Sequence, residues 1–148
     1  MTPIARRLKS ENEICEKDKA VTRVMNGYET ILLVDDEEFV IDANKLLLER
    51  LGYRVLTAQS GSEAIEIYKS SPEKVHMVFL DMIMPEMSGS ETYDKLKEID
   101  PRIKVILSSG YTIDGDAQDI LNRGCNGFIQ KPFKITHLSQ KLRQVLDE

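Results

Sequence analysis

From Thr30 onward, the sequence alternates short apolar runs with longer stretches of helical periodicity. The apolar runs cover residues 31–34, 54–57, 75–80, 104–107 and 127–129. Most of them are apolar at nearly every position, which is typical of parallel strands buried on both faces. Five alternations of strand and helix predict right-handed crossovers and a helix layer on each side of one sheet. The expected fold is therefore a three-layer α/β domain built on a doubly wound parallel sheet.

Start and stop signals separate the helices from these runs. Residues 60–63 and 88–91 both read SGSE, a capping box in which serine and glutamate satisfy the free amides at a helix start. Gly52 and Gly124 are placed as C-terminal caps, and Pro101 ends the third helix. Two helices carry a predicted apolar stripe: Val40, Ala43, Leu47 and Leu51 in the first, and Ile135, Leu138, Leu142 and Val145 in the last.

Residues 1–28 differ from the rest of the chain in charge. They hold six Lys or Arg against four Asp or Glu, whereas residues 29–148 hold 14 against 21. We expect a linker or partly helical N-terminal extension over 1–28 and one domain over 29–148. The formal charge of -5 argues against nucleic-acid binding. No stretch has the ~20 apolar residues of a membrane helix and the start lacks a signal peptide, so the expected location is cytoplasmic.

Three aspartates follow strands of the predicted sheet. Asp35 and Asp36 come directly after the first run, and Asp81 comes directly after the third. If these strands lie side by side, their carboxyl ends meet at one edge and the carboxylates come together. Such crowding is tolerable only if a cation or a proton neutralises part of the charge. A divalent metal beside one reactive carboxylate is the simplest arrangement that fits.

These aspartates belong to a set of landmarks in a fixed order. The set consists of Asp35-Asp36, Asp81, Met84-Pro85 with Gly89, Ser109-Gly110 and Lys131-Pro132. With it, the sequence resembles the receiver domain of bacterial two-component response regulators over about residues 29–148. The resemblance implies a flavodoxin-like fold with strand order 2-1-3-4-5.

The resemblance also implies a phosphoacceptor site that uses Mg²⁺. Asp81 is then the residue that accepts a phosphoryl group from a phosphohistidine on a histidine kinase or a histidine phosphotransfer protein. Asp36 binds Mg²⁺ directly together with Asp81, Asp35 binds it through water, and the carbonyl of Ile83 is a backbone ligand. Magnesium suits such a site because it prefers octahedral oxygen coordination and keeps several waters.

Three further residues match the family's positions around the phosphoryl group. Lys131 follows the fifth strand and precedes Pro132, which the resemblance places in a cis peptide, and its ammonium can pair with a phosphoryl oxygen. Ser109 matches the hydroxyl that senses phosphorylation, although the neighbouring Ser108 stays open as an alternative. Phe128 occupies the aromatic switch position and is expected to move inward with Ser109.

Two positions bear on the lifetime of the phosphorylated state. Ile83 and Tyr111 flank the expected path of an attacking water, and neither offers a carboxylate or an amide to orient it. We therefore predict slow self-dephosphorylation. His76 and His137 lack partners at metal or catalytic spacing, and Cys15 and Cys125 form no redox or metal motif, so structural roles are expected for all four.

The expected function is a phosphorylation-switched receiver whose output is a protein contact. The resemblance places that contact on the fourth helix, fifth strand and fifth helix, and it permits a monomer or a phosphorylation-dependent dimer. The chain resembles the C-terminal receiver of a hybrid histidine kinase, with a free-standing single-domain regulator as the alternative. A haloacid-dehalogenase-type phosphatase is a competing class, but it requires a second Asp where Ile83 stands. A receiver-like interaction module that is no longer phosphorylated is the third class.

Overall fold

The computed structural model describes residues 24–71, 74–110 and 115–148. The strands in these ranges are β1 (Thr30–Val34), β2 (Arg54–Ala58), β3 (Met77–Asp81), β4 (Val105–Ser109) and β5 (Gly127–Gln130). The helices are α3 (Glu38–Arg50), α4 (Gly61–Ser70), α5 (Gly89–Ile99), α6 (Gly115–Asn122) and α7 (Ile135–Leu146). Each predicted apolar run overlaps one of these strands, and no boundary differs by more than two residues.

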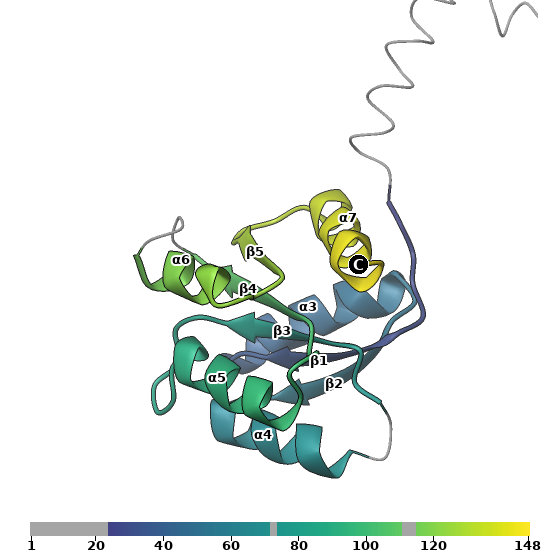
Figure 1. Ribbon diagram of the computed structural model, residues 1–148. Helices are drawn as coiled ribbons and strands as arrows, with labels where there is room; N and C mark the ends of the chain where they lie inside the picture. Colours follow the sequence, from purple (N-terminus) through teal and green to yellow (C-terminus); the bar gives the residue numbers. More distant parts are fainter. Residues whose placement is uncertain (1–23, 72–73, 111–114) are drawn as a thin grey trace, which may run out of the picture.

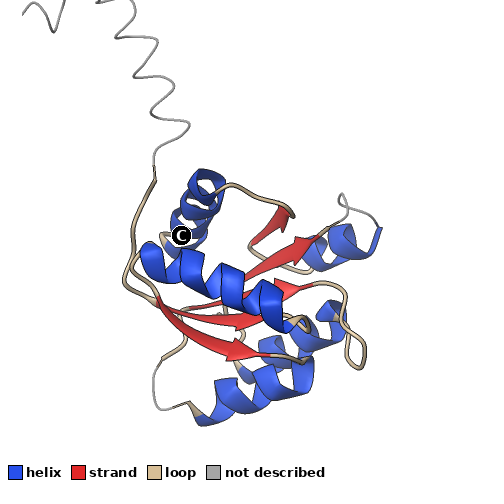
Figure 2. Ribbon diagram, turned by 180° about the vertical axis from the view of Figure 1, so that it is seen from behind, coloured by secondary structure: helices blue, strands red, loops and turns tan. Residues whose placement is uncertain are grey.

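All five strands pair in parallel in one sheet of order β2-β1-β3-β4-β5. Helices α3 and α7 cover one face of the sheet, and α4, α5 and α6 cover the other (Figures 1 and 2). Alternate residues of β1 enter different cores: Ile31 and Leu33 pack with α3 and α7, while Leu32 and Val34 pack with α4 and α5. The predicted three-layer fold and strand order are confirmed.

The predicted helix signals are found in place. The hydroxyls of Ser60 and Ser88 accept hydrogen bonds from the amides of Glu63 and Glu91, both at 3.1 Å. The carboxylate of Glu63 completes the capping box by accepting a hydrogen bond at 2.6 Å from the amide of Gln59, the residue before the Ser60 cap. Gly52 and Gly124 have φ values of 101° and 108°, the left-handed conformation that favours glycine at a helix end.

The apolar stripe predicted for the first helix is confirmed only in part: Leu51 is buried and Leu47 packs against the core, but the other positions do not form the buried face. The face of α3 that enters the core carries Ile41, Asn44 and Leu48, whereas Val40 and Leu47 are half-buried and Ala43 is exposed. Apart from Leu51, the predicted stripe is displaced from the buried face by one residue, about 100° around the helix. Apolar side chains occupy two adjoining faces of α3, and the polar Asn44 interrupts the buried one. The displaced stripe is thus a partly exposed apolar surface beside the core.

The carboxyl ends of the strands lie together at one edge of the sheet. The boundary predicted between residues 28 and 29 stays a prediction, since the structure describes only 24–28 of the preceding segment. In the described part of the chain, no helix combines the length and the apolar character needed to cross a membrane.

Candidate functional site

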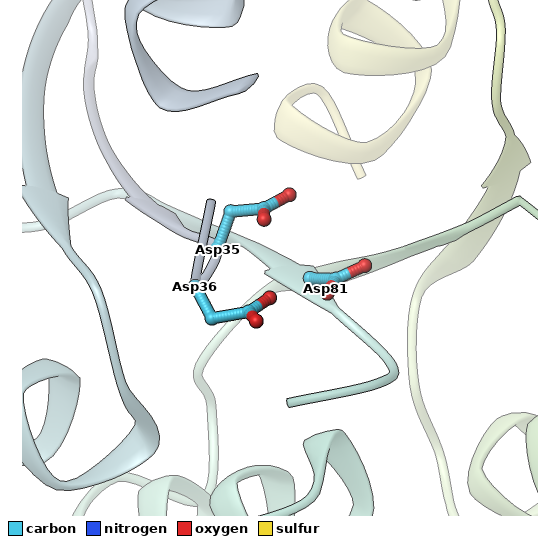
Figure 3. A group of neighbouring side chains, drawn as sticks. All are labelled: Asp35, Asp36 and Asp81. Carbon is cyan, nitrogen blue, oxygen red and sulfur yellow. The ribbon is translucent and has the colours of Figure 1, made fainter. Parts of the chain in front are cut away.

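The three aspartates predicted to meet lie at the carboxyl edge of the sheet. Asp81 is the last residue of β3, and Asp35 and Asp36 follow β1, its neighbour in the sheet. The register pairs Val34 with Leu80, so Asp35 and Asp81 leave their strands at the same level. Figure 3 shows the three side chains converging from these two strand ends.

This cluster has the geometry of a metal site. One carboxylate oxygen from each of Asp35, Asp36 and Asp81 can be chosen so that all three lie within 4.8 Å of one another. Asp35 and Asp81 are buried, at 2% and 7% exposure, and Asp36 is more accessible. The oxygens of closely spaced carboxylates form the hard donor set that Mg²⁺ prefers. The acidic triad is therefore able to hold a divalent cation.

Lys131 joins the cluster from the end of β5. Its ammonium donates to Asp35 Oδ2 at 2.9 Å and to Asp81 Oδ1 at 3.1 Å. The peptide bond between Lys131 and Pro132 is cis, as the resemblance implied. Sequence reasoning placed the ammonium near Asp81 but missed its pairing with Asp35, because that contact depends on the side-chain geometry.

The charges of this cluster shift the pKa of two groups. The pKa of Asp81 is raised to about 6, chiefly by burial and partly by the charges of Asp35 and Asp36, with Lys131 opposing the shift. Burial lowers the pKa of Lys131, but its hydrogen bonds and charge interactions with Asp35 and Asp81 outweigh burial and raise the pKa overall. A bound divalent cation would favour the ionised form of Asp81. Lys131 therefore stays charged at neutral pH, whereas the pKa of Asp81 lies close to the neutral range.

Ser109 and Ser108 differ in their position relative to the site. Ser108 is the register partner of Asp81, and Ser109 ends β4 one residue further along. Ser109 lines a cavity of about 410 Å³ together with Met82, Ile83 and Met84 from the loop after Asp81. Its carbonyl also accepts the amide of Lys131 at 2.7 Å. Both serines thus lie near the carboxyl end of β3, and the choice of Ser109 as the sensing hydroxyl stays a prediction.

The remaining candidates are placed as follows. Phe128 is half-buried in β5 and packs against the core shared with α4, α5 and α6. The Ile83 side chain is 60% exposed, and Tyr111 lies outside the described residues. His76 has a structural contact at the start of β1, where its Nδ1 accepts a hydrogen bond from the amide of Thr30 at 3.0 Å.

Of the other residues, His137 is exposed on α7. Cys125 is buried, with its thiol directed at the carbonyl of Val105 at 3.2 Å, and burial raises its pKa. Cys15 lies outside the described residues. The positions of His76 and Cys125 agree with the structural roles expected for them.

Comparison with known proteins identifies the class. Residues 31–143 match the response regulator receiver domain family, and the chain belongs to it. The chain is 34% identical over 137 residues to the sensor kinase CckA of Brucella abortus, covering 91% of this chain and 14% of that protein. It is 33% identical over 116 residues to the chemotaxis protein CheY of Thermotoga maritima, covering 78% of this chain and 95% of CheY.

The structural comparison agrees with this assignment. A chain in the CheX–CheY complex of Borrelia burgdorferi with BeF3 and Mg²⁺ superimposes with a TM-score of 0.75 at 28% identity, covering 84% of this chain and 97% of that chain. Fold, acidic pocket and sequence family together define a receiver domain of two-component signalling, with a pocket of the phosphoacceptor type. The chain spans only about 14% of the length of the sensor kinase relative.

Proposed function

We propose that Asp81 accepts a phosphoryl group from the phosphohistidine of a histidine kinase or a histidine phosphotransfer protein, in a reaction that requires Mg²⁺. The observation that carries this proposal is the convergence of Asp35, Asp36 and Asp81 with Lys131 at one strand edge. The BeF3 and Mg²⁺ bound in the Borrelia complex support it by similarity.

In the proposed reaction, a carboxylate oxygen of Asp81 attacks the phosphorus of the donor. The bond between phosphorus and the imidazole nitrogen breaks, its electron pair stays on the imidazole, and an acyl phosphate forms on Asp81. Such transfers have a loose, charge-rich transition state, so the protein contributes positioning and electrostatic stabilisation. Mg²⁺, when bound, would neutralise charge on the phosphoryl oxygens. Asp36 and Asp81 would hold it directly, Asp35 would hold it through water, and the carbonyl of Ile83 would be a further ligand.

Lys131 and Ser109 recognise the product. Transfer converts the Asp81 carboxylate into an acyl phosphate, whose negative charge lies on the phosphoryl oxygens. The Lys131 ammonium then leaves the carboxylates and pairs with a phosphoryl oxygen. The Ser109 hydroxyl donates to another phosphoryl oxygen. Its movement toward the phosphoryl group leaves space that Phe128 fills from β5. In this way phosphorylation alters the face formed by α6, β5 and α7, where we place the downstream protein contact.

The donor protein contacts a different face. Next to Lys131, an apolar groove of about 320 Å³ runs between α3 and the segment that precedes α7. It is lined mainly by Phe39, Val40, Ala43, Leu47, Pro132 and Phe133. Phe39 is 68% exposed and joins the other apolar residues of the groove in one patch, the kind of surface that marks a protein contact. A donor packed on this groove would present its phosphohistidine close to Asp81.

The similarity to CckA supports an origin in a hybrid histidine kinase, in which this receiver is joined to a kinase in one polypeptide. The similarity to the chemotaxis protein CheY supports a free-standing regulator instead. Cytoplasmic location and oligomeric state stay predictions.

The function is tested by incubating the protein with acetyl phosphate and Mg²⁺ and measuring its intact mass. We expect one phosphoryl adduct on the wild type and none on Asp81→Asn. Continuous turnover of acetyl phosphate without an adduct would support the phosphatase class. The absence of both adduct and turnover, with Mg²⁺ bound, would support the interaction module.

A further inference from the structure

The segment that leads into β1 is packed onto the domain. This lead segment (residues 24–29) runs beside α7 before it enters the sheet, and it is dark purple in Figure 1. The amide of Met25 donates to Ser139 Oγ at 3.0 Å, and the amide of Gly27 donates to the carbonyl of Leu51 at 2.9 Å. Ser139 is a fully buried residue of α7, and Leu51 caps α3. The lead segment is thus bonded to both helices on that face of the sheet.

Two glycines allow this close approach. A Cβ on Gly27 would lie 2.2 Å from the Tyr53 ring, and a Cβ on Gly52 would lie 2.3 Å from the carbonyl oxygen of Gly27. Neither distance is compatible with a side chain. The turn between α3 and β2 and the lead segment therefore fit together only because both positions lack one.

The lead segment ends in an ion pair with α7. Arg143 donates to Glu29 Oε1 at 2.7 Å, and the two side chains are only 14% and 8% exposed. Asp147 and the Tyr53 hydroxyl hold the same guanidinium. An arginine with several acceptors in a poorly hydrated position is a rigid contact.

Together with the Lys131–Asp35 pair, this pair holds the segment from Lys131 to the end of α7 against both ends of β1. Asp35 and Glu29 stand at opposite ends of β1, and Lys131 and Arg143 stand before the start and in the last turn of α7. One end is therefore held by the Lys131–Asp35 pair and the other by the Arg143–Glu29 pair. Only the first pair lies in the pocket of Asp81, so only that end is altered when the pocket fills.

We infer that α7 tilts about the Glu29–Arg143 pair when Asp81 carries a phosphoryl group, and that the lead segment transmits this movement to the chain preceding residue 24. The inference rests on the proposed function, because it requires Lys131 to leave Asp35 for a phosphoryl oxygen. Ser139 lies on α7 between the pivot and Lys131. A tilt therefore moves Ser139 and disturbs its bond with Met25, while Gly27, bonded to α3, keeps its contact.

Amide hydrogen exchange resolved by NMR on the full chain tests this, with Mg²⁺ alone and with Mg²⁺ and beryllofluoride as the phosphoryl mimic. We expect the exchange of the Met25 amide to accelerate by about tenfold, while that of Gly27 stays within about twofold. Resonance shifts at Lys131 and Ser109 report that the mimic has bound. If they shift and Met25 does not respond, or Gly27 responds as strongly as Met25, the inference is overturned. If they do not shift at all, the proposed function fails and the inference fails with it.

Two serine substitutions test whether the hydrogen bond between Met25 and Ser139 carries the movement of α7 to the lead segment. Ser139→Ala removes the acceptor for Met25, so its amide should exchange fast in both states while Lys131 still responds to the mimic. Ser70→Ala is the matched control, because Ser70 lies on α4 and donates its hydroxyl to the Glu66 carbonyl. It should leave the response of Met25 unchanged. A response of Met25 that persists in Ser139→Ala would show that α7 is not the route.

Discussion

Removing the charge of Asp81 should stabilise the metal-free protein, although it removes the residue that we assign the central chemical role. The pKa of Asp81 is raised from its usual 3.8 to about 6, chiefly by burial and partly by the charge of Asp35, with Lys131 opposing both. Each pKa unit corresponds to ~1.36 kcal/mol, so keeping Asp81 ionised at pH 7 lowers the free energy of unfolding by about 3 kcal/mol. Since an amide only approximates a neutral acid, we expect Asp81→Asn to raise it by about 2–3 kcal/mol.

The sign of the pH dependence follows from the raised pKa. Between pH 6 and 4 the folded protein takes up a proton on Asp81 before the unfolded chain does, so the destabilisation fades as the pH falls. The advantage of Asp81→Asn should therefore be largest at pH 7 and nearly absent at pH 4. Mg²⁺ at a hundredfold excess over Kd should bring the two proteins to nearly equal stability, because its binding to the folded wild type adds about 2.7 kcal/mol.

Urea unfolding in EDTA, followed by far-UV circular dichroism because the chain has no tryptophan, measures these free energies. Asp42→Asn, at an exposed position on α3, is the control and should change stability by less than about 0.5 kcal/mol. An Asp81→Asn variant no more stable than wild type at pH 7 would refute the reasoning. A difference that stays constant from pH 7 to pH 4 would do so as well.

Three further outcomes are expected. The acyl phosphate should persist for minutes or longer, and Ile83→Asn, which supplies an amide to orient water, should accelerate its loss by more than about threefold, as followed by loss of radiolabel; a wild-type lifetime of seconds, with little further acceleration in the variant, would contradict this. Gly89→Ala should destabilise the protein by about 1–3 kcal/mol in urea, since its Cβ would lie 2.8 Å from the Asp81 carbonyl oxygen, whereas Gly115→Ala, with open space around it, should not. Phe39→Ala should slow transfer from a phosphohistidine protein at least tenfold and leave labelling by acetyl phosphate unchanged; equal effects on both would remove the groove from the donor interface.

The strands and the site at their carboxyl edge follow from signals that are local in the sequence. Buried parallel strands are apolar on both faces, so their ends are marked sharply by Asp35 and Asp81. That marking explains why the convergence of the three aspartates was predicted correctly from the sequence. The family resemblance supplied the strand order, and the hydrogen-bonded register confirms it.

The errors and omissions occur where packing decides between faces. Helix α3 has apolar residues on two sides, and the buried Asn44 hides the true core face from a hydrophobicity pattern. The contact of Lys131 with Asp35 and that of Arg143 with Glu29 join residues 96 and 114 positions apart, and no local signal predicts them. The lead segment is too short to show a periodicity, so its fit against Gly52 could not be predicted from the sequence.

The proposed function depends on Asp81 carrying the phosphoryl group. Borohydride reduction converts an aspartyl phosphate to homoserine, and peptide mass spectrometry then locates the modified position. After phosphorylation by a histidine kinase in Mg²⁺, we predict homoserine at position 81 alone. Homoserine at position 35 or 36, or none anywhere in a protein that has taken up label, would contradict the account.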